Sequence, residues 1–240
     1  MIDMQPMRPA MLSPHPPMDF AWIEIVYFLV IFALCLIIYF RTKEIYSLTK
    51  HKGIKYFRNT FLFFAFAFSF RLFTSLFFIF RGFSSRHEPF HLMSFAFTFI
   101  AYFSSLAILS LTLSLIWKQL SNIKINLDLF MHLFVLLLTL IMFLTASFNI
   151  LIFIQLVVFV FSVVLSFIVF AKTKRKSFFS KMHLVYLFLF ILWFVNLLGP
   201  MGNLFDFYNR GFVYTVTALI FVYIVYKVIK RTSVDGKKKG

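Results

Sequence analysis

The chain has 240 residues, of which 62% are hydrophobic and only 13% are charged, and its formal net charge is +16. A soluble domain of this size cannot cover so much apolar surface with polar groups, so the composition excludes an ordinary soluble protein and indicates a membrane protein. The single cysteine, Cys35, excludes a disulfide within the chain and a cysteine-based metal site.

In chain order, a tail rich in methionine and proline (residues 1–18) precedes a long apolar region (19–230) and a basic tail (231–240). The apolar region divides into segments near 20–40, 60–80, 90–117, 129–145, 150–171, 182–199 and 210–229. Each segment approaches the ~20 residues that a helix needs to cross a bilayer. The stretch 129–171 carries no Asp, Glu, Lys or Arg, yet one helix of that length would reach roughly 60 Å. A break near 145–149 is therefore expected, and the fold class is an all-α bundle of seven transmembrane helices.

Lysine and arginine are distributed unevenly between these segments. Most of them fall between the first and second, third and fourth, and fifth and sixth segments, or after the last one. The opposite side holds Arg8, Arg81, Arg86 and Arg210. Because cytoplasmic loops are the basic ones, the N-terminus is predicted outside and the C-terminus inside a cell membrane. Expected partners are the lipid bilayer, anionic lipid headgroups at the basic loops and a cytoplasmic protein, and no nucleic acid is expected.

The string HEPFH (His87–His91) matches the H-E-x-x-H pattern of zinc proteases. That pattern needs both histidines on one face of a helix, with the glutamate between them. Pro89 belongs in the first turn of a helix, so the helix is expected to begin there, and the protease geometry is broken. A loose metal site of His87 and His91, with Glu88 or Asp206 as a further ligand, stays open at the outer rim, and with it a metal-dependent membrane hydrolase.

Arg71 lies near the middle of the segment 60–80, where an arginine costs about 2.5–3.5 kcal/mol on insertion scales. Its side chain should therefore face the interior of the bundle, where it either holds helices together or forms part of a ligand or ion site. Glu24 is the acidic residue placed well inside a segment, and Tyr102, Gln155 and Asn196 are further candidate partners.

The last apolar segment adds Tyr214 and Thr217 at a similar depth in the outer half. The predicted ligand-binding residues are Arg71, Glu24, Tyr102, Gln155, Asn196, Tyr214 and Thr217. The leading hypothesis is a non-enzymatic sensor or receptor-like module that binds a small or lipidic ligand there, without a cofactor, and acts through cytoplasmic partners. A transporter or transporter subunit that uses the same polar residues is the alternative.

The stretch from Leu48 to Arg71, LTKHKGIKYFRNTFLFFAFAFSFR, resembles a recurring block in uncharacterised archaeal seven-span membrane proteins. The resemblance covers the second predicted helix and the loop before it, and it implies no activity. The overall plan is similar to that of the membrane sensor modules that precede some histidine kinases. No kinase domain is expected after the last segment, so a signalling output would need a partner to supply it.

Overall fold

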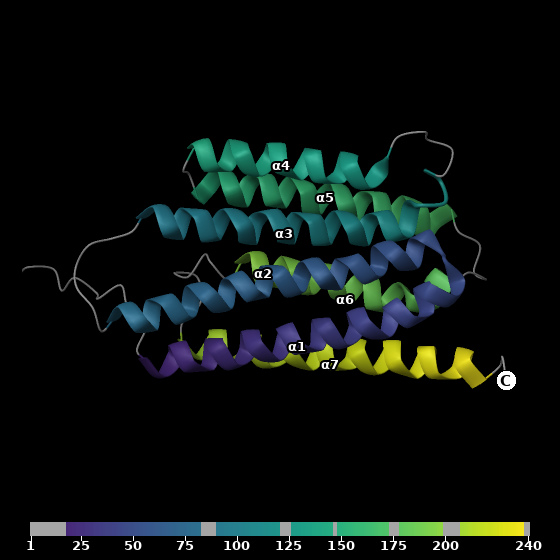
Figure 1. The fold of residues 1–240 in the computed structure, drawn as a ribbon, viewed down its shortest axis with the longest axis horizontal. Coiled ribbons are helices and arrows are strands. Elements are labelled where there is room, and N and C mark those ends of the chain that lie inside the picture. The colour runs from purple at the N-terminus through teal and green to yellow at the C-terminus, as the bar shows by residue number, and fades with distance from the viewer. Residues whose placement is uncertain are drawn as a thin grey trace, which may run out of the picture.

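The computed structural model describes residues 18–82, 90–120, 126–145, 148–172, 178–198 and 207–237. These residues form seven α-helices, one for each apolar segment (Figure 1). The helices are α1 (Met18–Thr49), α2 (Lys52–Gly82), α3 (Phe90–Ile116), α4 (Leu127–Thr145), α5 (Phe148–Lys172), α6 (Phe178–Leu198) and α7 (Phe207–Lys237). The all-helical fold is confirmed, and the expected break in the uncharged stretch lies between α4 and α5.

Among the described residues, four helices contain stretches long and apolar enough to cross a membrane. These stretches are Trp22–Thr49, Lys52–Phe77, Phe95–Ile116 and Gly211–Lys230, in α1, α2, α3 and α7. The apolar stretches described in α4, α5 and α6 are shorter: Leu127–Ile141, Phe153–Ile168 and Val185–Val195. These lengths support membrane association, whereas seven crossings and their orientation stay predictions.

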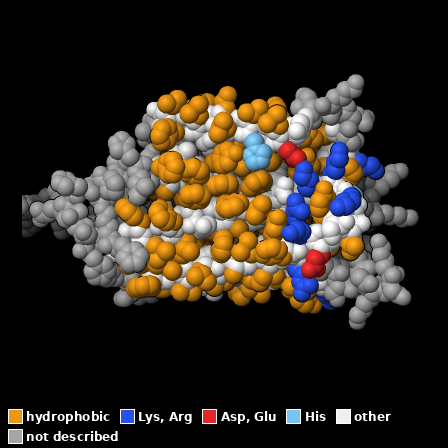
Figure 2. Space-filling model, in the orientation of Figure 1, with side chains coloured by type: hydrophobic (Ala, Val, Ile, Leu, Met, Phe, Trp, Pro, Cys, Tyr) orange, Lys and Arg blue, Asp and Glu red, His pale blue; other side chains and the backbone are white. Residues whose placement is uncertain are grey.

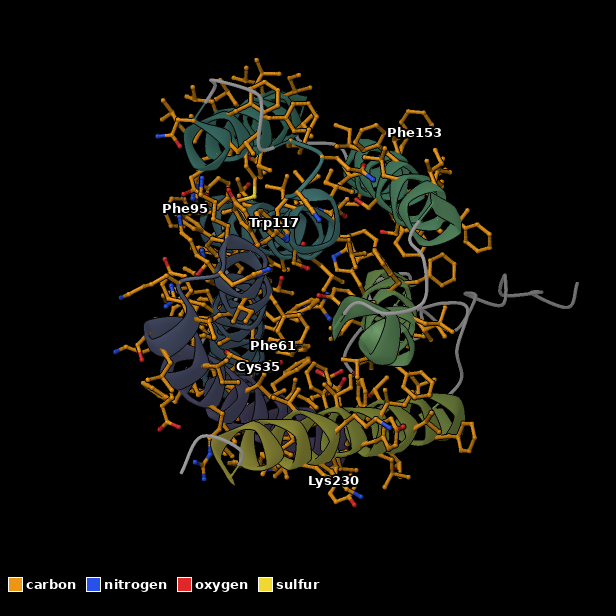
Figure 3. All side chains as sticks on the ribbon, turned by 90° about the vertical axis from the view of Figure 1, so that its right-hand side faces the viewer. Cys35, Phe61, Phe95, Trp117, Phe153 and Lys230 are labelled. Atoms are coloured by element: carbon orange, nitrogen blue, oxygen red, sulfur yellow. The ribbon has the colours of Figure 1, made fainter. Side chains whose placement is uncertain are left out.

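The helices pack as a closed bundle around α3. Helix α3 contacts α2, α4, α5 and α6, while α1 packs between α2 and α7, and α6 links α5 to α7 (Figures 1 and 3). The fully buried large side chains come from α1, α2, α3, α6 and α7. They are Ile31, Ile38, Phe61, Leu106, Ile108, Leu111, Tyr186, Leu189, Leu192, Phe221 and Ile224. Cys35 and Phe61, labelled in Figure 3, both belong to this core.

Helices α4 and α5 expose much of their apolar surface. Leu144 on α4 is 74% exposed and Phe167 on α5 is 75% exposed. Apolar side chains also cover most of the face shown in Figure 2. Water would penalise such a surface, whereas lipid chains would not, so the packing agrees with the composition.

A tight hairpin joins α1 to α2. Lys50 adopts a left-handed conformation with φ 51°, and its N–H donates to the Tyr46 carbonyl over 2.8 Å, which ends α1. The carbonyl of His51 accepts the Ile54 N–H over 3.0 Å and so begins α2. The His51 ring meets Trp117 edge to face at 4.6 Å, and burial lowers the pKa of this imidazole below its ordinary value of 6.5.

Candidate functional site

A carboxylate joins three helices in the half of the bundle where α1 begins. The Tyr214 hydroxyl on α7 donates to Glu24 Oε1 on α1 over 2.8 Å. The buried Ser75 hydroxyl on α2 donates to Glu24 Oε2 over 3.5 Å. Both carboxylate oxygens therefore accept hydrogen bonds from neutral groups, and neither donor cancels the negative charge.

Arg71 provides the opposite charge. It precedes Ser75 by one helical turn on α2, so the two residues share a face. The guanidinium lies over the Phe68 ring at 5.9 Å and within electrostatic range of the Glu24 carboxylate. A charge in an apolar bundle is costly, and two opposite charges in the same region reduce that cost.

A pair of stacked tyrosine rings lies in the same region. The Tyr27 and Tyr214 rings are 4.4 Å apart at an interplanar angle of 18°. The Thr217 hydroxyl, one turn after Tyr214, lies 2.8 Å from the Tyr27 hydroxyl and 2.9 Å from the Val213 carbonyl. Because a threonine hydroxyl has one proton, it can donate to the carbonyl while it accepts from Tyr27.

We call this set the charged cluster: Glu24, Tyr27, Arg71, Ser75, Tyr214 and Thr217. It presents one anion, one cation, several hydroxyls and aromatic faces from α1, α2 and α7. Such a set can hydrogen-bond a polar group and balance a molecule that carries both signs of charge.

The structure places Gln155 in a different network, between α3 and α5. Its amide nitrogen donates to the Ala101 carbonyl over 2.9 Å and to the Ser105 hydroxyl over 2.7 Å, and its oxygen accepts from Ser104 over 3.4 Å. The Trp193 indole on α6 donates to the Ser104 carbonyl over 3.1 Å. We call Ser104, Ser105, Gln155 and Trp193 the amide network. Its hydrogen bonds join α3, α5 and α6.

Tyr102 makes its polar contact with α4. Its hydroxyl lies 3.0 Å from His132 Nδ1, and Phe63 meets the same imidazole edge to face at 5.8 Å. Asn196 belongs to α6, and its side chain lies outside the described residues. The predicted set is therefore brought together in part: Arg71, Glu24, Tyr214 and Thr217 meet, whereas Tyr102 and Gln155 bind elsewhere.

The predicted outer metal site cannot be assembled from the described part of the chain. His87, Glu88 and Asp206 lie outside the described residues, as does the side chain of His91 in the first turn of α3. Within the ranges that the structure describes, no group of three or more His, Cys, Asp or Glu side chains could hold a metal. The rim site stays a prediction. Helix α3 begins at Phe90, one residue after Pro89.

Tyr27 and Ser75 belong to the cluster but were not expected in it. Tyr27 follows Glu24 by three residues, and Ser75 follows Arg71 by four, so helical spacing places each beside a charged residue. That spacing was the available signal. It is weak, because hydroxyl residues in apolar helices usually serve packing.

Comparison with known proteins gives limited information. A protein of Archaeoglobus fulgidus, described as uncharacterized, is 36% identical over 119 residues. The matched part is 48% of this chain and 52% of the relative, so the chain spans about half the length of the relative. No family model matches the chain, and neither does any solved structure. The likeness to an uncharacterised archaeal protein supports the archaeal part of the expected resemblance and names no activity, and the seven-span part stays a prediction.

Proposed function

We propose that the protein is a multi-pass protein of the cell membrane, with seven crossings, the N-terminus outside and the C-terminus in the cytoplasm. The distribution of charge supports this orientation. Figure 2 shows lysine and arginine gathered at the end of the bundle that holds the α1–α2 hairpin. The described basic side chains in the hairpin and the second half of α7 are Arg41, Lys43, Lys50, Lys52, Lys55, Arg58, Lys227 and Lys230. Cytoplasmic ends of membrane helices are enriched in these residues.

In this orientation the charged cluster lies in the outer half of the bundle, and we infer that it is a receptor-like ligand site. The observation that carries this proposal is the Tyr214–Glu24 hydrogen bond of 2.8 Å between α7 and α1, with the Arg71 guanidinium of α2 within electrostatic range of the carboxylate. Ionisable residues inside membrane helices are costly to keep, so by default they mark a functional site.

The chemistry of the cluster favours a small or lipidic ligand with a zwitterionic head. An ammonium group would meet the Glu24 carboxylate and the faces of Tyr27 and Tyr214, while an acidic group would meet Arg71. Helices α1 and α7 pack together and both run to the basic end. A ligand that replaces the Tyr214–Glu24 bond would therefore shift α1 against α7 and change the surface offered to a cytoplasmic partner.

Thermal unfolding of the purified protein tests the ligand site. The probes are glycine betaine, glutamate and short-chain phosphatidylcholine, each of which carries both signs of charge. We expect at least one probe to raise the unfolding midpoint of the wild type. The shift should vanish in Arg71→Leu and persist in Gln155→Leu, the control in the amide network. The ligand proposal fails if no probe shifts the wild type, or if Arg71→Leu responds as the wild type does.

Labelling of single cysteines tests the orientation. Cys35 is the single cysteine of the chain. In a Cys35→Ala background, the one thiol that can react with the label is therefore the engineered one. With a membrane-impermeant maleimide, Lys52→Cys in the hairpin should react after permeabilisation only, and Ser13→Cys in the outer tail should react in intact cells. The reverse pattern would overturn the proposed topology.

A further inference from the structure

Basic side chains at the α1–α2 hairpin lie against tyrosine rings. Lys50 Nζ is 5.9 Å from the centre of the Tyr46 ring. The Arg58 guanidinium lies between two rings, 4.9 Å from that of Tyr46 and 5.4 Å from that of Tyr39. Cation–π attraction of this kind holds a positive group beside a phenol, so a cation and a hydroxyl are presented together.

The same pairing recurs on α7. Lys227 Nζ lies 5.9 Å from the centre of the Tyr223 ring, and Lys230 Nζ lies 5.7 Å from that of Tyr226. Each lysine follows its tyrosine by four residues, which places the pair on one helix face. Lys230, labelled in Figure 3, is exposed together with Tyr226.

We call these residues the basic tyrosine belt: Tyr39, Tyr46, Lys50, Arg58, Tyr223, Tyr226, Lys227 and Lys230. Lysine and arginine gather at one end of the bundle, where the apolar surface gives way to charge (Figure 2). Large apolar side chains are exposed beside it, with Phe40 at 56%, Leu48 at 78% and Val222 at 52%. A surface that alternates cations, phenols and apolar groups matches the boundary between lipid headgroups and acyl chains better than it matches a water-facing protein interface.

The carboxylates described at this end are already paired with other bases. Glu44 is 3.7 Å from Arg41, and Asp128 forms an ion pair with Lys55. None of the described carboxylates pairs with a belt cation, and the hydrogen bonds of these cations go to neutral groups, from Arg58 to Asn59 and from Lys230 to Tyr226. A phosphate group at this level could accept from lysine ammonium groups and from tyrosine hydroxyls at once.

We propose that the basic tyrosine belt binds the headgroups of anionic phospholipids in preference to zwitterionic ones. The occupant is a lipid because the belt lies along the sides of α1, α2 and α7, at the level of exposed apolar side chains. An acidic protein would be expected to bind beyond the helix ends instead. This inference needs insertion into a bilayer but uses no residue of the charged cluster. In bilayers with identical leaflets it does not depend on the orientation, so its failure is distinguishable from failure of the proposed function.

The test uses the full chain in nanodiscs of phosphatidylcholine with a minor fraction of phosphatidylglycerol. Native mass spectrometry then gives the ratio of the two lipids that remain bound. A basic side chain near an anionic surface strengthens binding about fivefold, so the wild type should retain phosphatidylglycerol well above its share in the disc. The triple variant Lys50→Gln, Lys227→Gln, Lys230→Gln should lose this enrichment by on the order of tenfold or more.

The matched control is Arg81→Gln, Arg86→Gln, Arg210→Gln, which removes the same charge from the predicted opposite side and should keep the enrichment. The exposed single variant Lys230→Gln guards against misfolding of the belt triple and should lose part of the enrichment. Equal retention of both lipids by the wild type would overturn the proposal, as would an equal loss in the two triple variants. The first result would leave an acidic protein as the partner of the belt, and the second would reduce the effect to net charge.

Discussion

The charged cluster and the amide network both place polar groups in an apolar bundle, but they differ in charge. In the amide network, Gln155 and Trp193 donate to backbone carbonyls and a serine hydroxyl, so neutral groups satisfy one another. In the charged cluster, a carboxylate and a guanidinium are held among tyrosines. Neutral hydrogen bonds between membrane helices need no ligand to explain them, because they hold helices together. The charged residues need a further reason, and the proposed ligand would supply one.

The largest expected effect comes from breaking the charged cluster on one side. Arg71→Leu leaves the half-buried Glu24 carboxylate among neutral donors, and because both charges are only partly desolvated the cost should be about 2–3 kcal/mol, below that of a fully buried pair. The free energy of unfolding, measured by denaturant titration in mixed micelles, should fall by that amount. Phe73→Leu, at a position on the same helix that is 52% exposed, is the control and should change little. A loss for Arg71→Leu as small as that of the control would mean that the two charges do not interact.

A smaller effect is expected in the amide network. Gln155→Leu removes three hydrogen bonds but leaves no charge unpaired, so the loss should be about 1–2 kcal/mol. The same unfolding titration measures it. Probe-induced stabilisation should be unchanged in this variant. If that stabilisation disappeared, the two regions would be one site, and the distinction between them would be wrong.

A substitution in the α1–α2 hairpin changes stability without touching the charged cluster or the amide network. Lys50 has a φ of 51°, which an L side chain adopts at a cost, whereas glycine adopts it freely. Lys50→Gly should therefore raise the free energy of unfolding by about 1 kcal/mol. Lys52→Gly, at the first residue of α2, is the control and should not raise it. A lower stability for Lys50→Gly would show that the lysine side chain contributes more than the backbone strain costs.

The smallest expected effect is a pH dependence at the same hairpin. Because burial lowers the pKa of His51 in the folded state, the unfolded state binds a proton more readily. This contribution is constant above about pH 6.5. Stability is then lost as the pH falls from 6.5, the unfolded value, toward the lower folded value. The difference in unfolding midpoint between pH 7.5 and 5.5 should be smaller in His51→Gln than in the wild type, and an equal difference would remove His51 from the account.

Much of the fold could be predicted because hydropathy reports which segments are long and apolar. Each of the predicted segments became one helix, and the break near 145–149 followed from length alone. The site was harder, because the position of a residue along the chain gives its depth but not the direction of its side chain around the bundle. Tyr102 and Gln155 were placed by depth, yet α3 directs Tyr102 to α4, and α5 directs Gln155 to α3. Arg71 and Glu24 met because α1 and α2 are neighbours joined by a short hairpin.

A double-mutant cycle on Glu24 and Arg71 tests whether these charges serve ligand binding rather than the fold. The variants are Glu24→Leu, Arg71→Leu and the pair together, each measured by unfolding with and without the zwitterionic probes. Replacement of a buried ion pair by apolar residues is often neutral or stabilising. If the two charges serve ligand binding, the double variant should regain most of the stability that Arg71→Leu loses and should no longer respond to any probe. A double variant that loses the sum of the single effects, or that still responds to the probes, would contradict this role.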